Sequence, residues 1–418
     1  MSARVRSMAF SRRPRRGVVL ILTLWIVIVL SILAYSLAYE MRLEMKVTKL
    51  KKDEAMAIAV ARAGIAKGLT DVKNDLLIDH AAKSDPTDKS GVFDALGDIW
   101  AAPKDKTDIE FGSGTYTVEI VDEESKLSLN LARRESVALM MQLVEQFGLR
   151  DKEAEPIANA IWDWQDADDN PVGPIGENES DFYTETVEKV MKLKKGELPL
   201  IRMKNDRFTT VEELLEVPGM TPTLFYGYDP EDPEEYDKAI QSQWSNKPEE
   251  RVLGLKDLVT VNSSGKLNLN TASKPVLIAL MSAAKGSPGE AEALAEKIMD
   301  ARQGSRSARN IDNDNAFRTA ADISRIAEIT PWTARMTFYQ PYDIQSATFT
   351  IRSRGTVGEI SKTVEVMVRR NYEVFIRDEK TEDRKRTIIE KVRKPTSHDR
   401  RNLQIPNSAV RVLSWKEY

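Results

Sequence analysis

The chain of 418 residues contains no cysteine and only two histidines, His80 and His398. The absence of cysteine excludes disulfides, thiol nucleophiles and cysteine-ligated zinc sites. Two histidines are too few for most histidine-based metal sites and for most catalytic triads. These absences count against an enzyme, and we expect neither catalytic activity nor catalytic residues.

Long hydrophobic runs are also scarce, because the chain has only one, from Val18 to Ala38. Its 21 residues carry no charge, and the first charged residue after it is Glu40. A helix of this length, at about 1.5 Å per residue, matches the roughly 30 Å hydrocarbon core of a bilayer. We therefore predict a transmembrane helix at residues 18–38. Residues 39–80 lack proline and carry apolar side chains at helical spacing, so we expect them to continue it as an amphipathic helix.

Acidic residues are missing from the first 16 positions, which contain six arginines. The positive-inside rule keeps this end in the cytoplasm and places the large domain on the opposite side of the membrane. The formal net charge is −4, so setting aside these six positive charges leaves −10 for the rest of the chain. A dedicated nucleic-acid binder needs a cationic surface. We therefore expect no nucleic-acid partner.

Gly17 separates the basic leader from the apolar run in the stretch "RRPRRGVVLILTLW". A cleaved secretory signal would have an apolar stretch of only about 7–15 residues before a small-x-small site. The run here is longer, although an ordinary signal anchor would have the same basic flank. A small residue on the cytoplasmic side suits a protease that cuts before the membrane segment and leaves the helix attached.

A sequence repeat follows the helix, since "KLSLNLA" at residues 126–132 returns as "KLNLNTA" at residues 266–272. Further on, "FTTVEELLEVPGMT" corresponds to "FRTAADISRIAEIT", and each copy is expected to form an extended segment, two helices and a short third helix after a phenylalanine-led turn. The offsets between the copies place about 28 extra residues in the first one. The pattern resembles helix-hairpin-helix DNA binders. However, neither copy has their Gly-hydrophobic-Gly turn, so a structural helical module is the favoured interpretation.

The extra residues of the first copy form an acidic segment, "DWQDADDNPVGPIGENESDFY" at residues 163–183. Its prolines and glycines indicate a loop, and clustered carboxylates repel one another unless a cation neutralises them. Oxygen ligands on a flexible loop suit Ca²⁺, although the spacing is not that of an EF-hand. We predict a structural Ca²⁺ site with the ligands Asp166, Asp168, Asp169, Glu177 and Asp181. A solvated acidic loop is the simpler alternative, and a carboxylate pair for glycoside hydrolysis is a remote one.

Strand patterns flank the helical copies. Residues 114–124 alternate apolar and polar side chains, and residues 347–370 read as a hairpin around Gly355–Gly358. We expect these segments to form one sheet into which the helical module is inserted. Residues 371–418 are highly charged and receive no assignment.

The combination of a long N-terminal helix, flanking strands and a duplicated helical module resembles the minor pseudopilin K family of type II secretion systems. Members of this family are type IV pilin-like. The resemblance is carried by "RRGVVLILTLW", "SLNLARRESV", "IWDWQDADDNP", "FTTVEELLEVPGMT" and "LNLNTASKPVL". The resemblance implies an α+β fold: a pilin-like α/β domain with an N-terminal transmembrane and amphipathic helix, interrupted by a large helical insertion with two SAM/helix-hairpin-helix-like repeats. It also implies cleavage after Gly17 by prepilin peptidase, N-methylation of Val18 and Ca²⁺ binding.

The same resemblance implies a function. The chain would cap the tip of the periplasmic pseudopilus and initiate its assembly, and Leu22 replaces the glutamate that pilins packed inside a filament carry at this position. The implied partners are the I and J minor pseudopilins, the major pseudopilin, prepilin peptidase and the inner-membrane assembly platform. The chain would be a single-pass protein of the bacterial inner membrane with a periplasmic domain. The alternative is a minor pilin of a type IV pilus or a competence pseudopilus, with DNA contact through the helix-hairpin-helix-like repeats.

The expected organisation has eight parts. They are a leader (1–17), a transmembrane helix (18–38), its amphipathic continuation (39–80), a pilin-like strand (110–125), the first helical repeat with the acidic insertion (126–225), the second repeat (266–332), the C-terminal strands of the sheet (345–370) and a charged extension (371–418).

Overall fold

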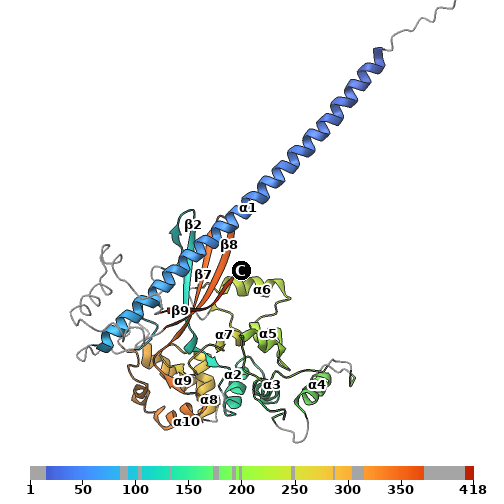
Figure 1. The fold of residues 1–418 in the computed structure, drawn as a ribbon. Coiled ribbons are helices and arrows are strands. Elements are labelled where there is room, and N and C mark those ends of the chain that lie inside the picture. Colours follow the sequence, from blue (N-terminus) through green and yellow to red (C-terminus); the bar gives the residue numbers. More distant parts are fainter. Residues whose placement is uncertain are drawn as a thin grey trace, which may run out of the picture.

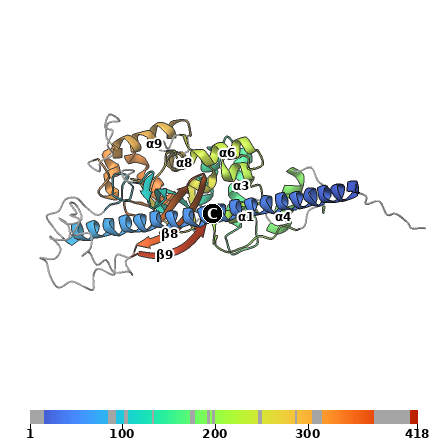
Figure 2. The same cartoon turned by 90° about the horizontal axis from the view of Figure 1, so that it is seen from above.

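The computed structural model describes residues 16–84, 93–101, 106–131, 134–172, 178–190, 194–196, 200–245, 250–285, 288–303, 315–370 and 410–418. A single long helix, α1 (Arg16–Ser84), projects from a mixed helical and sheet domain (Figures 1 and 2). Its first half is exposed from Val19 to Leu50, and it is the one described helix long and apolar enough to cross a membrane. The continuous helix predicted from residue 18 to residue 80 is confirmed.

The second half of α1 lies on a five-stranded antiparallel sheet. The strand order is β1 (Ile109–Phe111), β2 (Gly114–Asp122), β7 (Thr348–Val357), β8 (Ile360–Arg370) and β9 (Val410–Glu417). Apolar residues of α1 and of the sheet form one buried cluster. The predicted strand and hairpin are confirmed, and they pair directly through β2 and β7 despite more than 200 residues between them.

The edge strand β9 was not predicted, because residues 371–418 were treated only as a charged extension. It pairs with β8 from Val364 to Arg370, with a register shift between Met367 and Val368. This irregularity interrupts the alternation of apolar and polar residues that identifies a strand in a sequence. Residues 410–417 thus form an edge strand of the five-stranded sheet.

The helical module is inserted between β2 and β7 and shows the same order of elements twice. The first copy has β3 (Leu127–Ser128), α2 (Ser136–Glu145), α3 (Asp151–Asp163), α4 (Glu179–Val190), η2 (Val211–Glu216) and α5 (Pro222–Tyr226). The second has β5 (Leu267–Asn268), α8 (Lys274–Lys285), α9 (Pro288–Gln303), η4 (Ala320–Arg325), η5 (Thr330–Trp332) and α10 (Thr333–Tyr339). Among the described residues, α4 of the acidic insertion has no counterpart in the second copy, and η5 has none in the first. The assignment of the copies to a SAM or helix-hairpin-helix class stays a prediction.

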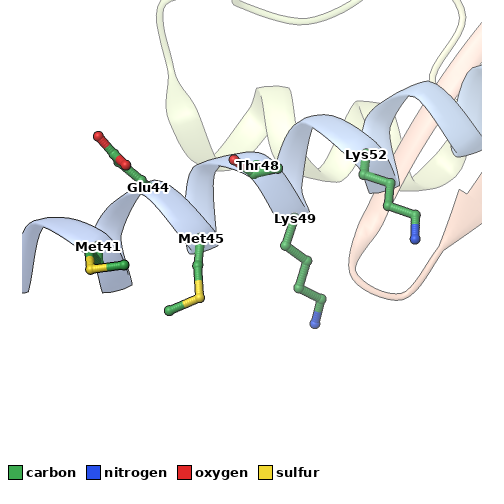
Figure 3. A pocket seen from close by; sticks show the side chains of 6 residues that line it. All are labelled: Met41, Glu44, Met45, Thr48, Lys49 and Lys52. Atoms are coloured by element: carbon green, nitrogen blue, oxygen red, sulfur yellow. The ribbon is translucent and has the colours of Figure 1, made fainter. Parts of the chain in front are cut away.

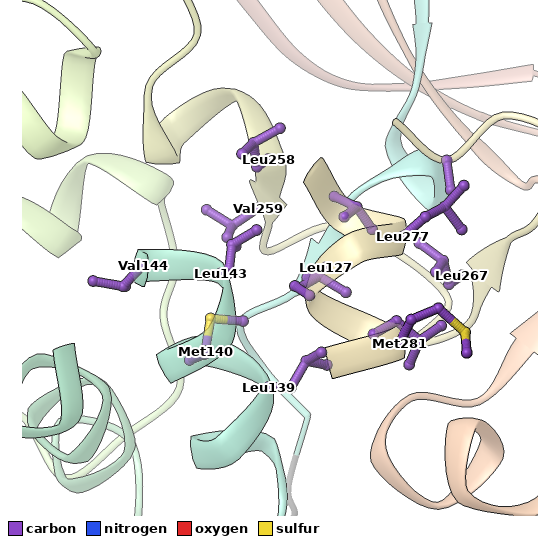
Figure 4. Packing of buried hydrophobic residues seen from close by; sticks show 14 of the residues in the cluster. Leu127, Leu139, Met140, Leu143, Val144, Leu258, Val259, Leu267, Leu277 and Met281 are labelled. Atoms are coloured by element: carbon purple, nitrogen blue, oxygen red, sulfur yellow. The ribbon is translucent and has the colours of Figure 1, made fainter. Parts of the chain in front are cut away.

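Short connecting elements complete the module. They are η1 (Glu123–Ser125), α6 (Pro233–Ser242), α7 (Leu255–Leu258), β4 (Val259–Thr260) and β6 (Tyr342–Asp343). Each copy is closed by a two-residue parallel ladder, β3 with β4 and β5 with β6. The copies pack through α2 and α8 around one apolar core, in which Leu127, Leu143 and Leu277 are fully buried (Figure 4).

An asparagine holds the phenylalanine-led turn in each copy. Asn130 accepts a hydrogen bond from the backbone N–H of Phe208 and donates one to its C=O, both at 2.9 Å. Asn270 makes the same two bonds to Phe317, also at 2.9 Å. An acid then caps the following short helix, because Glu213 accepts from the N–H of Thr210 and Asp322 from that of Thr319. The repeat is therefore a repeat of contacts as well as of elements.

Replacing these two asparagines should have unequal effects. Asn270 is 2% exposed, so Asn270→Ala leaves the buried N–H and C=O of Phe317 without their side-chain partner. The expected loss in the free energy of unfolding is about 2–3 kcal/mol, against about 1 kcal/mol for Asn130→Ala, whose site water can reach. Denaturant titration of the full chain in detergent measures both values. Equal losses, or a loss below about 0.5 kcal/mol for Asn270→Ala, would contradict this assignment.

Candidate functional site

The N-terminal part of α1 carries the residues that processing and filament packing would involve. Gly17 and Val18 lie in its first turn, and Leu22 is exposed on the apolar surface. Cleavage, methylation and the meaning of Leu22 remain predictions.

Between the apolar run and the sheet, α1 keeps a surface that nothing in the described chain covers. Met41, Met45 and Thr48 lie along one side of the helix, with charged Glu44, Lys49 and Lys52 beside them (Figure 3). They line a shallow, open hollow. Met41 and Met45 are more than half exposed, as are Leu43 and Leu50. Apolar side chains with flanking charges suit packing against another helix.

The acidic insertion brings three carboxylates together at the ends of two helices. Asp163 is the last residue of α3, Asp166 follows in the turn, and Glu179 begins α4. One oxygen from each lies within 4.8 Å of the others. Asp163 and Glu179 are both completely buried. Carboxylates this close and this buried repel one another strongly.

Several oxygens of this cluster have no hydrogen-bond partner in the described part of the chain. They are both carboxylate oxygens of Glu179, Oδ1 of Asp163 and Oδ1 of Asp166. Burial, followed by the charges of Asp163 and Asp166, raises the pKa of Glu179 to about 8. Burial and the charge of Asp168 raise the pKa of Asp166 to about 6. A hard divalent cation would remove both the repulsion and the unpaired oxygens, so the residues fit such an ion.

Hydrogen bonds to the second oxygen of Asp163 fix the position of its side chain. Its Oδ2 accepts hydrogen bonds from the Tyr183 hydroxyl at 2.6 Å and from the Val172 N–H at 2.9 Å. The Tyr183 side chain is 2% exposed, so this bond is shielded from water. Oδ1 has no hydrogen-bond partner in the described residues and stays available to a cation, and outer partners of this kind orient metal ligands.

This group differs from the predicted ligand set. Asp166 is in it, whereas Asp168 is exposed and accepts hydrogen bonds from Asn170. Asp169 is exposed and bonds to Asn178, Asp181 is exposed on α4, and Glu177 lies outside the described residues.

The structure instead points to Asp163 and Glu179, which were not among the predicted ligands. Asp163 lies three residues after buried Ala160, on the apolar face of α3. This helical spacing was the feature of the sequence from which the burial of Asp163 could have been predicted.

A second acidic cluster consists of Asp75, Asp94 and Asp98, and the side chain of Arg370 provides its positive charge. Nη2 of Arg370 lies 2.8 Å from Asp75 and 2.8 Å from Asp94. The guanidinium group also stacks over Phe349. We interpret this cluster as a structural ion pair between α1, the segment that follows it and the end of β8.

Parts of the chain are similar to known proteins. The family described as type II secretion system (T2SS), protein K, matches residues 121–230, from the end of β2 to the loop after α5. The type II secretion system protein K of Pseudomonas aeruginosa is 25% identical over 299 residues, which are 70% of this chain and 73% of that protein. The crystal structure of the GspK-GspI-GspJ complex from enterotoxigenic Escherichia coli has a chain with 17% identity and a TM-score of 0.49, covering 78% of this chain and 94% of that one. The chain thus resembles minor pseudopilin K of the type II secretion system, a type IV pilin-like protein.

Proposed function

We propose that the chain is a minor pseudopilin of a type II protein secretion system. The observation that carries this proposal is the match to protein K across the start of the helical module, in a chain that also has a pilin-like helix and sheet. The described residues include one candidate membrane helix, which suits a single-pass anchor in the inner membrane. The sheet and the helical module, which together form the head of the protein, would then lie in the periplasm.

The place of the subunit is the tip of the pseudopilus, where it initiates assembly with the I and J minor pseudopilins. Two features support this. The helical module makes the head much wider than α1, so a subunit above it in the filament would collide with the head (Figure 1). Leu22 also supplies no carboxylate, and a subunit with no neighbour above it does not need one to neutralise a neighbour's terminal amine. The exposed surface of α1 at Met41 and Met45 would pack against the partner helices.

A minor pilin of a type IV pilus or a competence pseudopilus is the second candidate, and the match to protein K does not favour it. The major pseudopilin, prepilin peptidase and the inner-membrane assembly platform are the remaining proposed partners.

Processing of the N-terminus tests the pilin-like part of the proposal. Protein extracted from cell membranes should begin at Val18 and carry one additional methyl group, as shown by intact mass and N-terminal sequencing. Cells without prepilin peptidase should yield the unprocessed chain, and this sample serves as the control. A Met1 terminus in wild-type cells would leave an ordinary signal anchor and contradict the proposal.

We also propose that Ca²⁺ binds between Asp163, Asp166 and Glu179. Glu179→Gln keeps the size of the side chain and removes one charge, so it should weaken Ca²⁺ binding at least about tenfold. Asp181→Asn removes the same charge from an exposed position on the same helix and should bind as the wild type does. Calorimetric titration of chelator-treated protein measures both. Equal affinity in the two variants would show that the site lies elsewhere.

A further inference from the structure

Three consecutive acids, Asp122, Glu123 and Glu124, are buried where the chain leaves the sheet for the helical module. Asp122 ends β2, and the other two begin η1. None of them is more than 3% exposed, which is rare for carboxylates. They lie outside the candidate cation site, and nothing in the proposed function uses them.

Glu124 connects the two parts of the domain directly. One of its oxygens accepts the N–H of Ser264, in the loop between β4 and β5 of the helical module, at 3.0 Å. The other accepts the N–H of Thr348, the first residue of β7, also at 3.0 Å. A single carboxyl group therefore bridges the module and the sheet.

Its neighbours make similar bridges. Oδ2 of Asp122 accepts from Asn268 and Thr271 of the module and from Ser346 at the start of the sheet, and its Oδ1 accepts the N–H of Glu124 at 2.8 Å. Glu123 accepts from Thr260 of β4 and Thr350 of β7, and pairs with Lys126 at 2.8 Å. We call Asp122, Glu123 and Glu124 with these partners the junction network.

The junction network continues to α1. The Asn268 side chain also donates to the C=O of Asp94, whose carboxylate pairs with Arg370 beside Asp75 of α1. Five buried carboxylates thus meet Lys126 and Arg370, and buried Lys106 lies near Asp75. The contacts that reach Asp122 and Glu124 from the module come from uncharged groups, and the charge of Asp94 adds to the repulsion on Asp122.

We propose that the junction network is a pH-sensitive joint, in which a proton on Glu124 keeps the helical module fixed on the pilin-like sheet. Loss of that proton places two uncompensated charges side by side in a buried position. Glu124 relieves this repulsion by moving toward water, which breaks its bonds to Ser264 and Thr348, the bonds that join the two parts of the fold. Each part keeps its own core, so the joint loosens before either part unfolds.

The electrostatics agree in direction with this geometry. Burial and then the charge of Asp122 raise the pKa of Glu124 to about 8, and burial raises the pKa of Asp122 to about 6. Glu123 differs, since its contacts with Lys126 lower its pKa despite burial. The closed joint thus binds a proton more tightly than the open joint, where Glu124 returns to its ordinary pKa of 4.5. The free energy of opening therefore falls as the pH rises from about 4.5 to about 8 and levels off above that.

Hydrogen exchange of the full chain in detergent, measured between pH 6 and pH 9, tests the proposal. After correction for the intrinsic exchange rate, residues 261–271 and 344–350 should exchange at least about tenfold faster at pH 8 than at pH 6, because one proton is lost. Exchange in α8, inside the module core, should stay unchanged over the same range. Corrected exchange that is flat, or that rises equally in α8, would overturn the proposal.

Three variants identify the residue that carries the titrating proton. Glu124→Gln cannot ionise, so the pH dependence should disappear, while Glu123→Gln next to it should keep the wild-type profile. Asp122→Asn removes the charge that raises the pKa of Glu124, so the rise should move to lower pH. The pH profile of Asp122→Asn tests the proposal even if Glu124→Gln fails to fold. An unchanged profile in Glu124→Gln or in Asp122→Asn would contradict the assignment to this pair.

Discussion

Arg370→Met should lower the free energy of unfolding by about 3–5 kcal/mol. The Arg370 side chain is fully buried at the end of β8 and lies 2.8 Å from both Asp75 and Asp94. Methionine would fill much of the same space but would leave two buried carboxylates without their cation, and such a loss is strongly destabilising. The contact of the guanidinium group with the Phe349 ring would also be lost. Denaturant titration in detergent, followed by circular dichroism, gives the value.

Arg369→Met is the matched control, because Arg369 is the preceding residue of the same strand and its side chain is exposed. Its expected effect is within about 0.5 kcal/mol, as for most surface substitutions. Similar losses for the two variants would mean that the buried ion pair does not stabilise the joint between α1 and the sheet. Lowering the pH should narrow the difference between the variants, since protonation of Asp75 and Asp94 removes the charges that Arg370 neutralises.

Gly355→Ala should be the second most damaging substitution, with an expected loss of about 3 kcal/mol. Gly355 lies in β7 directly under α1, and a Cβ atom there would be 2.2 Å from the Ala57 carbonyl oxygen and 2.5 Å from the Ala61 nitrogen. These are backbone atoms of the long helix, so the clash can be relieved only by moving the helix away from the sheet. Overpacking of this kind costs about 1–3 kcal/mol, and the absence of a movable side chain places this case at the upper end.

Gly289→Ala serves as its control. Gly289 lies in the first turn of α9, and a Cβ atom there would meet nothing within 4 Å. Alanine is also the better helix former, so this variant should be neutral or slightly more stable. Thermal melting of the two variants beside the wild type measures the difference. If Gly355→Ala melts with the wild type, α1 does not pack on the sheet at the distance described.

Local patterns were sufficient to predict the long helix, the three main strands and the order of elements in the helical copies. Apolar periodicity identifies each of these within a short window, and the repeat of "KLSLNLA" as "KLNLNTA" locates the copies. The paired asparagines stood in those same motifs, 140 positions apart, but their bonds to Phe208 and Phe317 depend on how the chain folds back.

The candidate cation site was predicted only in part, for a related reason. Composition located the acidic segment and Asp166 within it, but exposure separates ligands from solvated acids, and exposure is set by tertiary packing. Asp163 and Glu179 are buried because α3 and α4 meet there, whereas Asp168 and Asp169 lie on the outer turn. The junction network was likewise hidden, since Glu124 bonds to residues 140 and 224 positions away.

The most direct test of the account is co-expression of the full chain with the I and J minor pseudopilins of its own secretion system. After solubilisation and size-exclusion chromatography, native mass spectrometry should show one complex containing one copy of each chain. Replacing Met41 and Met45 by glutamate should weaken that complex, because the exposed surface of α1 would then carry charge where we propose that a partner helix packs. A chain that elutes alone while the I and J proteins bind each other would contradict the account.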